Sequence, residues 1–126
     1  MNDPASLEVA GVLAALAVSN MEASIEWTTR LFARPPDARP METLADWDFG
    51  PHGTLQLVLD PDRAGGSLLT LHVQGIAAAR AQLADRGITL DYDDTTSTKV
   101  KFGQLSDPDD NAITLVEPLG NPDATA

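Results

Sequence analysis

The sequence contains no cysteine, so neither disulfide bonds nor thiolate chemistry is available to the chain. It also lacks an apolar run long enough to span a bilayer, and its first residues, MNDPASLE, do not have the basic start and apolar core of a signal peptide. From these absences we expect a cytoplasmic protein without membrane contact. Its 126 residues are enough for one domain with a hydrophobic core and too few for two independent domains.

Basic residues are also scarce. Eight Lys and Arg stand against nineteen Asp and Glu, which gives a net charge of −11. Nucleic-acid binding draws on clustered basic side chains, so this balance argues against a nucleic-acid partner. The acidity has two interpretations: it keeps the protein soluble, or it steers a cationic small molecule toward an acidic groove. Two acidic clusters would serve the second role, Asp91, Asp93 and Asp94, and Asp107, Asp109 and Asp110.

What the sequence does contain is a strand–helix unit that occurs twice. In residues 66–88 an apolar run of strand length is broken by Gly75, and a segment with apolar residues at helical spacing follows. Residues 11–33 repeat this pattern when Val18 is set against Val73. A further strand follows each copy, TLQLVLD (Thr54–Asp60) and AITLVEP (Ala112–Pro118). A repeat of this length predicts one supersecondary unit used twice.

The boundaries of the expected elements follow from local signals. Asn20 is a good helix N-cap, and Pro35-Pro36 requires that helix to stop by Arg34. Gly87 stands where a left-handed C-cap of the second helix would lie. We expect strands at 12–18, within 41–60, and at 68–73, 89–94, 99–106 and 113–117, with turns at 51–53 and 107–111 and a frayed tail from residue 119.

The element order, the segment SDPDDNAITLVEP and the segment LAALAVSNMEASIEW resemble the vicinal oxygen chelate superfamily. That superfamily includes glyoxalase I, extradiol dioxygenases, and bleomycin-resistance and fosfomycin-resistance proteins. The resemblance covers about residues 12–118 and implies an α+β fold, in which two βαβββ modules form a curved, partly open mixed sheet around a cavity. Residues 1–126 would then be a single domain, with module 1 at about 9–60, module 2 at about 66–118 and a flexible tail at 119–126. The chain departs from the usual pattern at Asp110, where glycine is common, and at Leu31-Phe32-Ala33, where Leu-Gly is common.

The resemblance also implies where a metal would be held. In the metal-dependent members, the first and last strands of each module supply one inward ligand each. Motif matching assigns these four places to Leu13, Gln56, Leu68 and Thr114. Two leucines offer no donor atom, and divalent ions prefer carboxylates, imidazoles or thiolates. We therefore predict no metal ligands and no cofactor, which argues against metal-dependent glyoxalase or dioxygenase activity.

Alternation along the strands extends the inward-facing set. If Leu68 faces inward, so do Thr70 and His72; Leu13 brings Ala15 and Ala17, and Gln56 brings Val58. The predicted ligand-binding residues are Trp47, Phe49, Gln56, Thr70, His72 and Thr114. His72 is also the candidate catalytic base, or else a strand-end histidine satisfied by backbone or water.

The sequence leaves the roles of several aromatic residues open. Trp47 either stacks on a planar ligand, with Phe49 beside it, or serves as a barrel or dimer-interface aromatic. Trp27 is expected to pack in the core or at an interface. The sequence does not reveal which way Tyr92 and Phe102 face.

Two functional hypotheses follow. The first is a metal-independent small-molecule-binding protein, similar to the drug-sequestering resistance proteins, that holds an aromatic or cationic compound. The second is a metal-free isomerase or lyase that uses His72 as base, with Gln56 or Thr114 positioning a carbonyl. A family member with a closed pocket and a role in protein contact is a third possibility. We expect a homodimer, because an open curved sheet leaves apolar edges, and the sequence leaves open whether the modules pair within a chain or across a swapped dimer.

Overall fold

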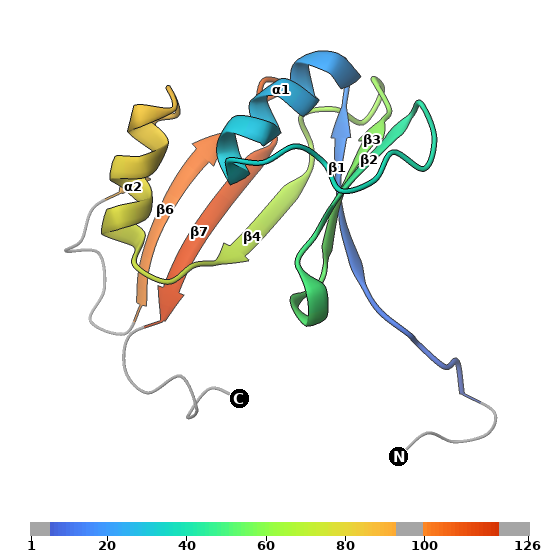
Figure 1. Cartoon of the computed structure of the whole chain (residues 1–126), viewed down its shortest axis with the longest axis horizontal. Coiled ribbons are helices and arrows are strands. Elements are labelled where there is room, and N and C mark those ends of the chain that lie inside the picture. The colour runs from blue at the N-terminus through green and yellow to red at the C-terminus, as the bar shows by residue number, and fades with distance from the viewer. Residues whose placement is uncertain (1–5, 93–99, 119–126) are drawn as a thin grey trace.

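The computed structural model describes residues 6–92 and 100–118 of the chain (Figure 1). Its elements, in order, are β1 (Leu13–Val18), α1 (Met21–Phe32), β2 (Leu44–Asp48), a single 3-10 turn η1 (Gly50–His52), β3 (Thr54–Leu59), β4 (Leu68–His72), α2 (Ile76–Asp85), β5 (Asp91–Tyr92), β6 (Val100–Ser106) and β7 (Ala112–Pro118). The expected strand at 89–94 is shorter, because only β5 pairs, and residues 93, 94 and 99 and the tail from 119 lie outside the described residues.

The described strands form two sheets with one shared plan. Their orders are β1-β3-β2 and β4-β7-β6-β5. In each sheet the first strand of the module runs parallel to the last, and the other pairs are antiparallel. Module 1 keeps only an isolated bridge, Ala38 to Asp46, where module 2 has β5. The α+β fold with two βαβββ modules is therefore confirmed.

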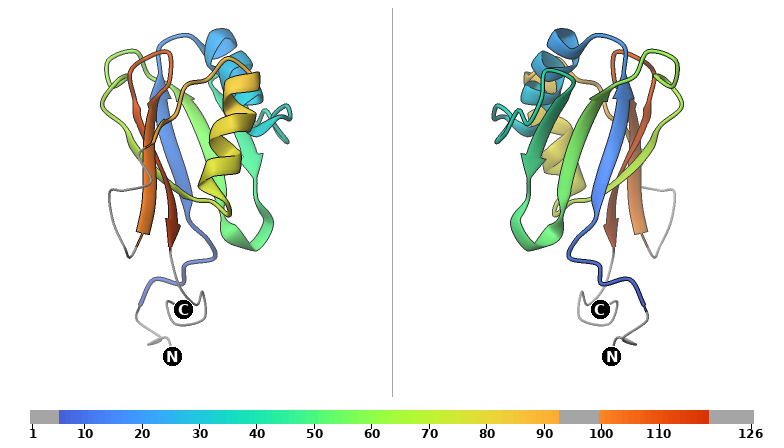
Figure 2. Two further views of the ribbon diagram at one scale, coloured as in Figure 1. Left: turned by 90° about the vertical axis from the view of Figure 1, so that its left-hand side faces the viewer. Right: turned by 90° about the vertical axis from the view of Figure 1, so that its right-hand side faces the viewer.

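The two modules meet inside one chain. β1 contacts β4, and Figure 1 shows α1 near this junction and α2 alongside the sheet that contains β6 and β7; Figure 2 shows the same arrangement from two further sides. The helices are joined at their C-terminal ends. Arg30 Nη1 donates to the carbonyl of Arg86, 3.2 Å away, and Arg86 Nη2 donates to the carbonyl of Leu31, also at 3.2 Å. Each arginine thus satisfies carbonyl groups at the end of the other helix.

The start and end of α1 follow the local signals in the sequence. Asn20 has an extended backbone, and its side-chain oxygen accepts a hydrogen bond from the amide of Ala23 at 3.0 Å. Ala33 ends the helix in the left-handed conformation, with φ of 57°, directly before Arg34 and the two prolines. Both ends are where the sequence predicted them.

The start of α2 depends on a residue from another element. Gly75, with φ of 76°, occupies the N-cap and has no side chain to offer. Glu117 of β7 replaces it, because its Oε1 accepts a hydrogen bond from the amide of Ile76 at 3.0 Å. This bond lowers the pKa of the Glu117 carboxyl below its ordinary value, and the amide of Gly75 and the charge of Lys101 lower it further.

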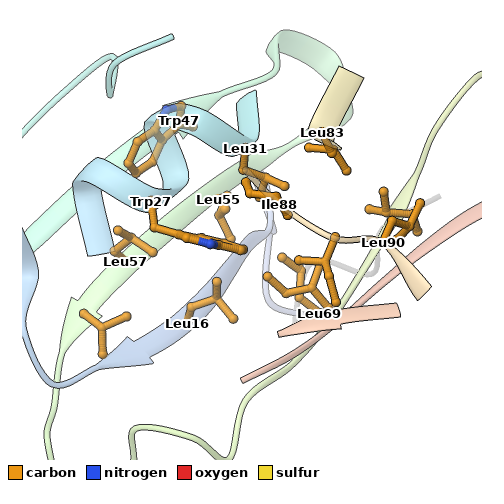
Figure 3. Packing of buried hydrophobic residues seen from close by; sticks show 14 of the residues in the cluster. Leu16, Trp27, Leu31, Trp47, Leu55, Leu57, Leu69, Leu83, Ile88 and Leu90 are labelled. Atoms are coloured by element: carbon orange, nitrogen blue, oxygen red, sulfur yellow. The ribbon is translucent and has the colours of Figure 1, made fainter. Parts of the chain in front are cut away.

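Strand alternation divides each sheet into two faces. The face toward the helices carries one continuous core drawn from both modules, and Figure 3 shows Leu16 and Leu55 from one sheet and Leu69 from the other in the same cluster as Trp27. Trp47, Leu57 and Ile113 are fully buried in this core. We call the opposite side of the two sheets the open face.

Among the described residues, no helix is long and apolar enough to cross a membrane.

The Glu117 cap predicts a dependence of stability on pH. Because the pKa of Glu117 is lower in the folded protein, wild type should be more stable than Glu117→Gln above the ordinary glutamate pKa of about 4.3. That advantage should disappear as the pH falls through the lowered pKa of the folded state. Urea unfolding of both proteins between pH 7 and pH 3 measures the difference. Glu26→Gln, on the exposed side of α1, is the control, and an unchanged gap between wild type and Glu117→Gln across this range would refute the cap.

Candidate functional site

The register of the second sheet groups three predicted site residues, Thr70, His72 and Thr114, on the open face. Thr70 and Thr114 lie side by side with Gln104 across β4, β7 and β6. His72 follows in the next row, beside Val116 and Phe102. Gln104 was missed by sequence reasoning, although alternation from Phe102 would have placed both on one side.

The first sheet presents an equivalent polar row. Ala15, Gln56 and Asp46 lie side by side across β1, β3 and β2. Gln56 Nε2 donates a hydrogen bond to Asp46 Oδ1 at 2.9 Å, so the carboxylate orients the amide. Asp46 is an open-face residue that sequence reasoning did not include among the candidate site residues. Its position directly before the buried Trp47 is the signal that could have found it, since neighbours in a strand face opposite sides.

The structure does not bring Trp47 to the open face. Trp47 pairs with Leu55 on the helix side of the sheet, and its side chain is 0% exposed. Its indole Nε1 donates to the carbonyl of Arg34 at 3.0 Å, and its ring centroid lies 6.1 Å from that of Phe32. A large aromatic side chain buries more apolar surface than its aspartate neighbours can, which decides the face of β2.

Phe49 also turns toward α1. Its ring meets that of Phe32 edge-on at a centroid separation of 5.1 Å, and the Arg34 guanidinium lies 5.2 Å from the centre of the Phe49 ring. Of the two aromatics whose direction the sequence left open, Phe102 reaches the open face and is 37% exposed. Tyr92 pairs with the buried Gly103, and its hydroxyl is buried without a hydrogen-bond partner among the described residues.

A pocket of 680 Å³ lies where the open face of the first sheet meets the linker between the modules, residues 60–67. The strand wall consists of Ala15, Ala17 and Val58, and small side chains on β1 are what leaves the space. The linker forms the other wall, which sequence reasoning missed because loop residues show no periodicity. The full lining is Ala15, Ala17, Val58, Asp60, Asp62, Arg63, Ala64, Gly66 and Ser67.

The linker wall of this pocket is charged. Arg63 Nη1 pairs with Asp60 Oδ2 at 2.8 Å, while Asp62 has no ion-pair partner in the part of the chain that the structure describes. The strand wall is apolar, and Ser67 Oγ in the linker accepts a hydrogen bond from the amide of Ala17 at 3.0 Å. The pocket thus combines an apolar wall with two carboxylates.

The four places that motif matching assigned to metal ligands all lie on the open face, but they do not form a donor set. Leu13 is 54% and Leu68 86% exposed, and neither carries a donor atom. Directly across from Gln56 and Thr114 stand Ala15 and Thr70. Along the paired first and last strands of both modules, the described open face carries one imidazole, that of His72, and no carboxylate. Among the described residues no group of three His, Asp or Glu side chains is placed to hold a metal ion. These residues do not fit the metal centre of the metal-dependent relatives.

His72 ends β4 with an exposed side chain. Within the described residues, it has no hydrogen-bond or ion-pair partner. The imidazole is therefore accessible on the open face, but no carboxylate orients it as catalytic bases usually require.

No protein-family model and no curated protein sequence matches the chain. Several solved structures, in contrast, match the chain over most of its length. A glyoxalase/bleomycin resistance protein from Catenulispora acidiphila aligns with a TM-score of 0.78 at 27% identity, over 85% of this chain and 96% of that one. TnmS3, an antibiotic-binding protein from Streptomyces sp. CB03234, aligns with a TM-score of 0.74 at 24% identity, over 90% of this chain and 99% of TnmS3. A glyoxalase family protein from Bacillus anthracis has a TM-score of 0.70 at 15% identity, over 90% and 98% of the two chains.

These structures span nearly their whole length on this chain, so the likeness covers both modules and their pairing. The protein has the glyoxalase/bleomycin-resistance fold of the vicinal oxygen chelate superfamily, as its sequence motifs indicated.

Proposed function

We propose that this protein binds and sequesters a small organic molecule on its open face, without a metal ion. The observation that carries this proposal is the 680 Å³ pocket between the alanines of β1 and the linker. Its volume lies in the range of small-molecule sites, roughly 300–1,000 Å³. The antibiotic-binding neighbour TnmS3, which shares the fold, supports a small-molecule ligand.

The charges around the open face favour a ligand with an apolar or planar body and a cationic group. Asp60 and Asp62 line the pocket with Arg63 as the only basic lining residue, and Asp46 lies on the same face of β2. The net charge of −11 adds a long-range attraction for cations. The apolar strand wall of the pocket (Ala15, Ala17 and Val58) supplies the contact area that an aromatic body would need.

The side chains on the open face favour ligand binding over catalysis. Leu13 and Leu68 remove two of the four ligands that metal-dependent relatives use, and His72 lacks an orienting partner among the described residues. Gln56, Thr70 and Thr114 are further polar groups on the open face, but none of them lines the pocket, so they would contact only a molecule that extends beyond it.

A dye-binding experiment tests this function. Proflavine, a planar aromatic cation, should bind to wild type and lose affinity as salt is added. The anionic dye 1-anilinonaphthalene-8-sulfonate should bind at least about tenfold more weakly, since one opposed charge at a partly desolvated site is worth about 1.4 kcal/mol or more. Ala17→Leu should weaken proflavine binding at least about tenfold, because the larger side chain occupies the pocket. Fluorescence polarisation measures all three affinities.

Ala81→Leu, the same change on an exposed position of α2, is the matched control and should leave proflavine affinity unchanged. Addition of a chelator should also have no effect. Equal binding of the two dyes, or a Kd for proflavine that Ala17→Leu leaves unchanged, would contradict the proposed site.

The proposal includes a homodimer, because the open face keeps apolar side chains in water. Leu68 is 86% exposed, Leu13 54% and Phe102 37%. A second copy related by a two-fold axis would cover them and enclose the pocket. Sedimentation equilibrium should show a dimer for wild type and a shift toward monomer for Leu68→Asp. A monomeric wild type at high micromolar concentration would contradict this part of the proposal.

A further inference from the structure

One buried side chain, the amide of Asn111, joins the two walls of the pocket. Asn111 is 0% exposed and comes from the turn before β7, in module 2. Its Oδ1 accepts hydrogen bonds from the amides of Gly65 and Ser67, both at 2.9 Å, in the linker wall. Its Nδ2 donates to the carbonyl of Ala17, at 2.8 Å, in the strand wall. This planar group therefore bridges the linker and β1, beside the direct bond from the Ala17 amide to Ser67 Oγ.

The orientation of this amide is fixed by a neighbouring carboxylate. Asn111 Nδ2 also donates to Asp107 Oδ2 at 2.8 Å, while Asp107 Oδ1 accepts from the backbone amide of Asn111 at 2.8 Å and from that of Asp109 at 3.0 Å. Two donors and two acceptor positions of the amide are thus all in use, which leaves no alternative rotamer that keeps the bonds. The bonds of Asp107 within the turn therefore hold the Asn111 side chain in one orientation.

The linker lies against this turn at a distance that tolerates no side chain. A Cβ on Gly65, where φ is +95°, would lie 2.8 Å from the carbonyl oxygen of Asp109. The linker wall makes further hydrogen bonds: Ser67 Oγ accepts from the amide of Ala17, and the Ser67 carbonyl accepts from the amide of Ala112. Asn111 is the side chain that bonds to both walls at once, although it does not itself line the pocket.

We infer that Asn111 is a positioning residue for the pocket: it holds the linker wall at the separation from β1 that a bound molecule requires. The inference rests on the proposed function and deepens it, because it names the residue that determines the shape of the site. Loss of the amide would leave the half-buried amides of Gly65 and Ser67 without their acceptor and would free the linker to move.

The test uses the absence of cysteine from the chain. Ala64→Cys places one reporter thiol in the linker wall, and its rate of labelling by a thiol reagent follows linker mobility without any ligand. In this background Asn111→Asp is isosteric but turns a carboxylate oxygen toward the carbonyl of Ala17 and the Asp107 carboxylate. We expect labelling about fivefold faster or more, and proflavine affinity lower by at least about fivefold, in protein whose circular dichroism remains native.

Two further variants keep the outcome decisive. Gly65→Ala leaves Asn111 in place but forces the linker away from Asp109, so it should reproduce both changes even if Asn111→Asp fails to fold. Ser19→Ala removes a hydrogen bond between Asp109 and the end of β1, which joins the same turn to the same strand outside the pocket, and should change neither readout.

If wild type does not bind proflavine but Asn111→Asp and Gly65→Ala accelerate labelling, the proposed ligand fails and the positioning role stands. If the folded variants leave both labelling and affinity at wild-type values, the positioning role is overturned. It is also overturned if Ser19→Ala has effects as large as theirs, because any contact between the modules would then suffice.

Discussion

The shape of the pocket depends on the buried amide of Asn111, which bonds to β1 and to the linker at once. Each module can pair its own strands, but neither fixes its position against the other through a shared ladder, because the hydrogen-bonded sheets stop at β1 and β4. The junction is joined by the shared hydrophobic core, by the arginine bonds between the helix ends, and by polar bonds from the turn before β7 to β1 and to the linker. Such a fully satisfied buried network favours one relative placement of the modules, since any shift leaves several buried groups unpaired. The pocket lies at this junction and takes its shape from it.

The division of each sheet into two faces gives the rest of the site its character. Leucine, isoleucine and tryptophan side chains fill the helix side, while β1 presents alanines and β4 and β7 present threonines to the open side. This asymmetry is what converts a strand surface into a binding surface: small residues leave volume, and a few polar rows supply hydrogen bonds. A face built this way is suited to hold a compound by shape. Among the described residues it carries no group of His, Asp or Glu side chains placed to hold a metal ion.

Much of the fold could be predicted from the sequence because its signals are local or periodic. Asn20, Pro35 and Gly87 mark helix ends by backbone chemistry that acts within a few residues, and alternation assigned Thr70, His72, Gln56 and Thr114 to one side of their strands. Trp47 shows the limit of alternation. The pattern of aromatic and aspartate residues does not reveal which face of the sheet the helices cover, and burial of Trp47 in the core beside Phe32 settles it. The hydrogen bonds between Asn111 and the linker join residues more than forty positions apart, so no local sequence pattern could predict them. Glu117 as the cap of α2 was hidden for the same reason.

The proposed ligand would occupy the space between β1 and the linker. Its position can be read from backbone amide chemical shifts during a titration of ¹⁵N-labelled protein with proflavine. The largest shifts should fall on Ala15, Ala17, Val58, Gly66 and Ser67, and residues on the outer side of α2 should remain unchanged. Shifts concentrated on the helix side of the sheets, or spread evenly over the acidic surface, would contradict this position.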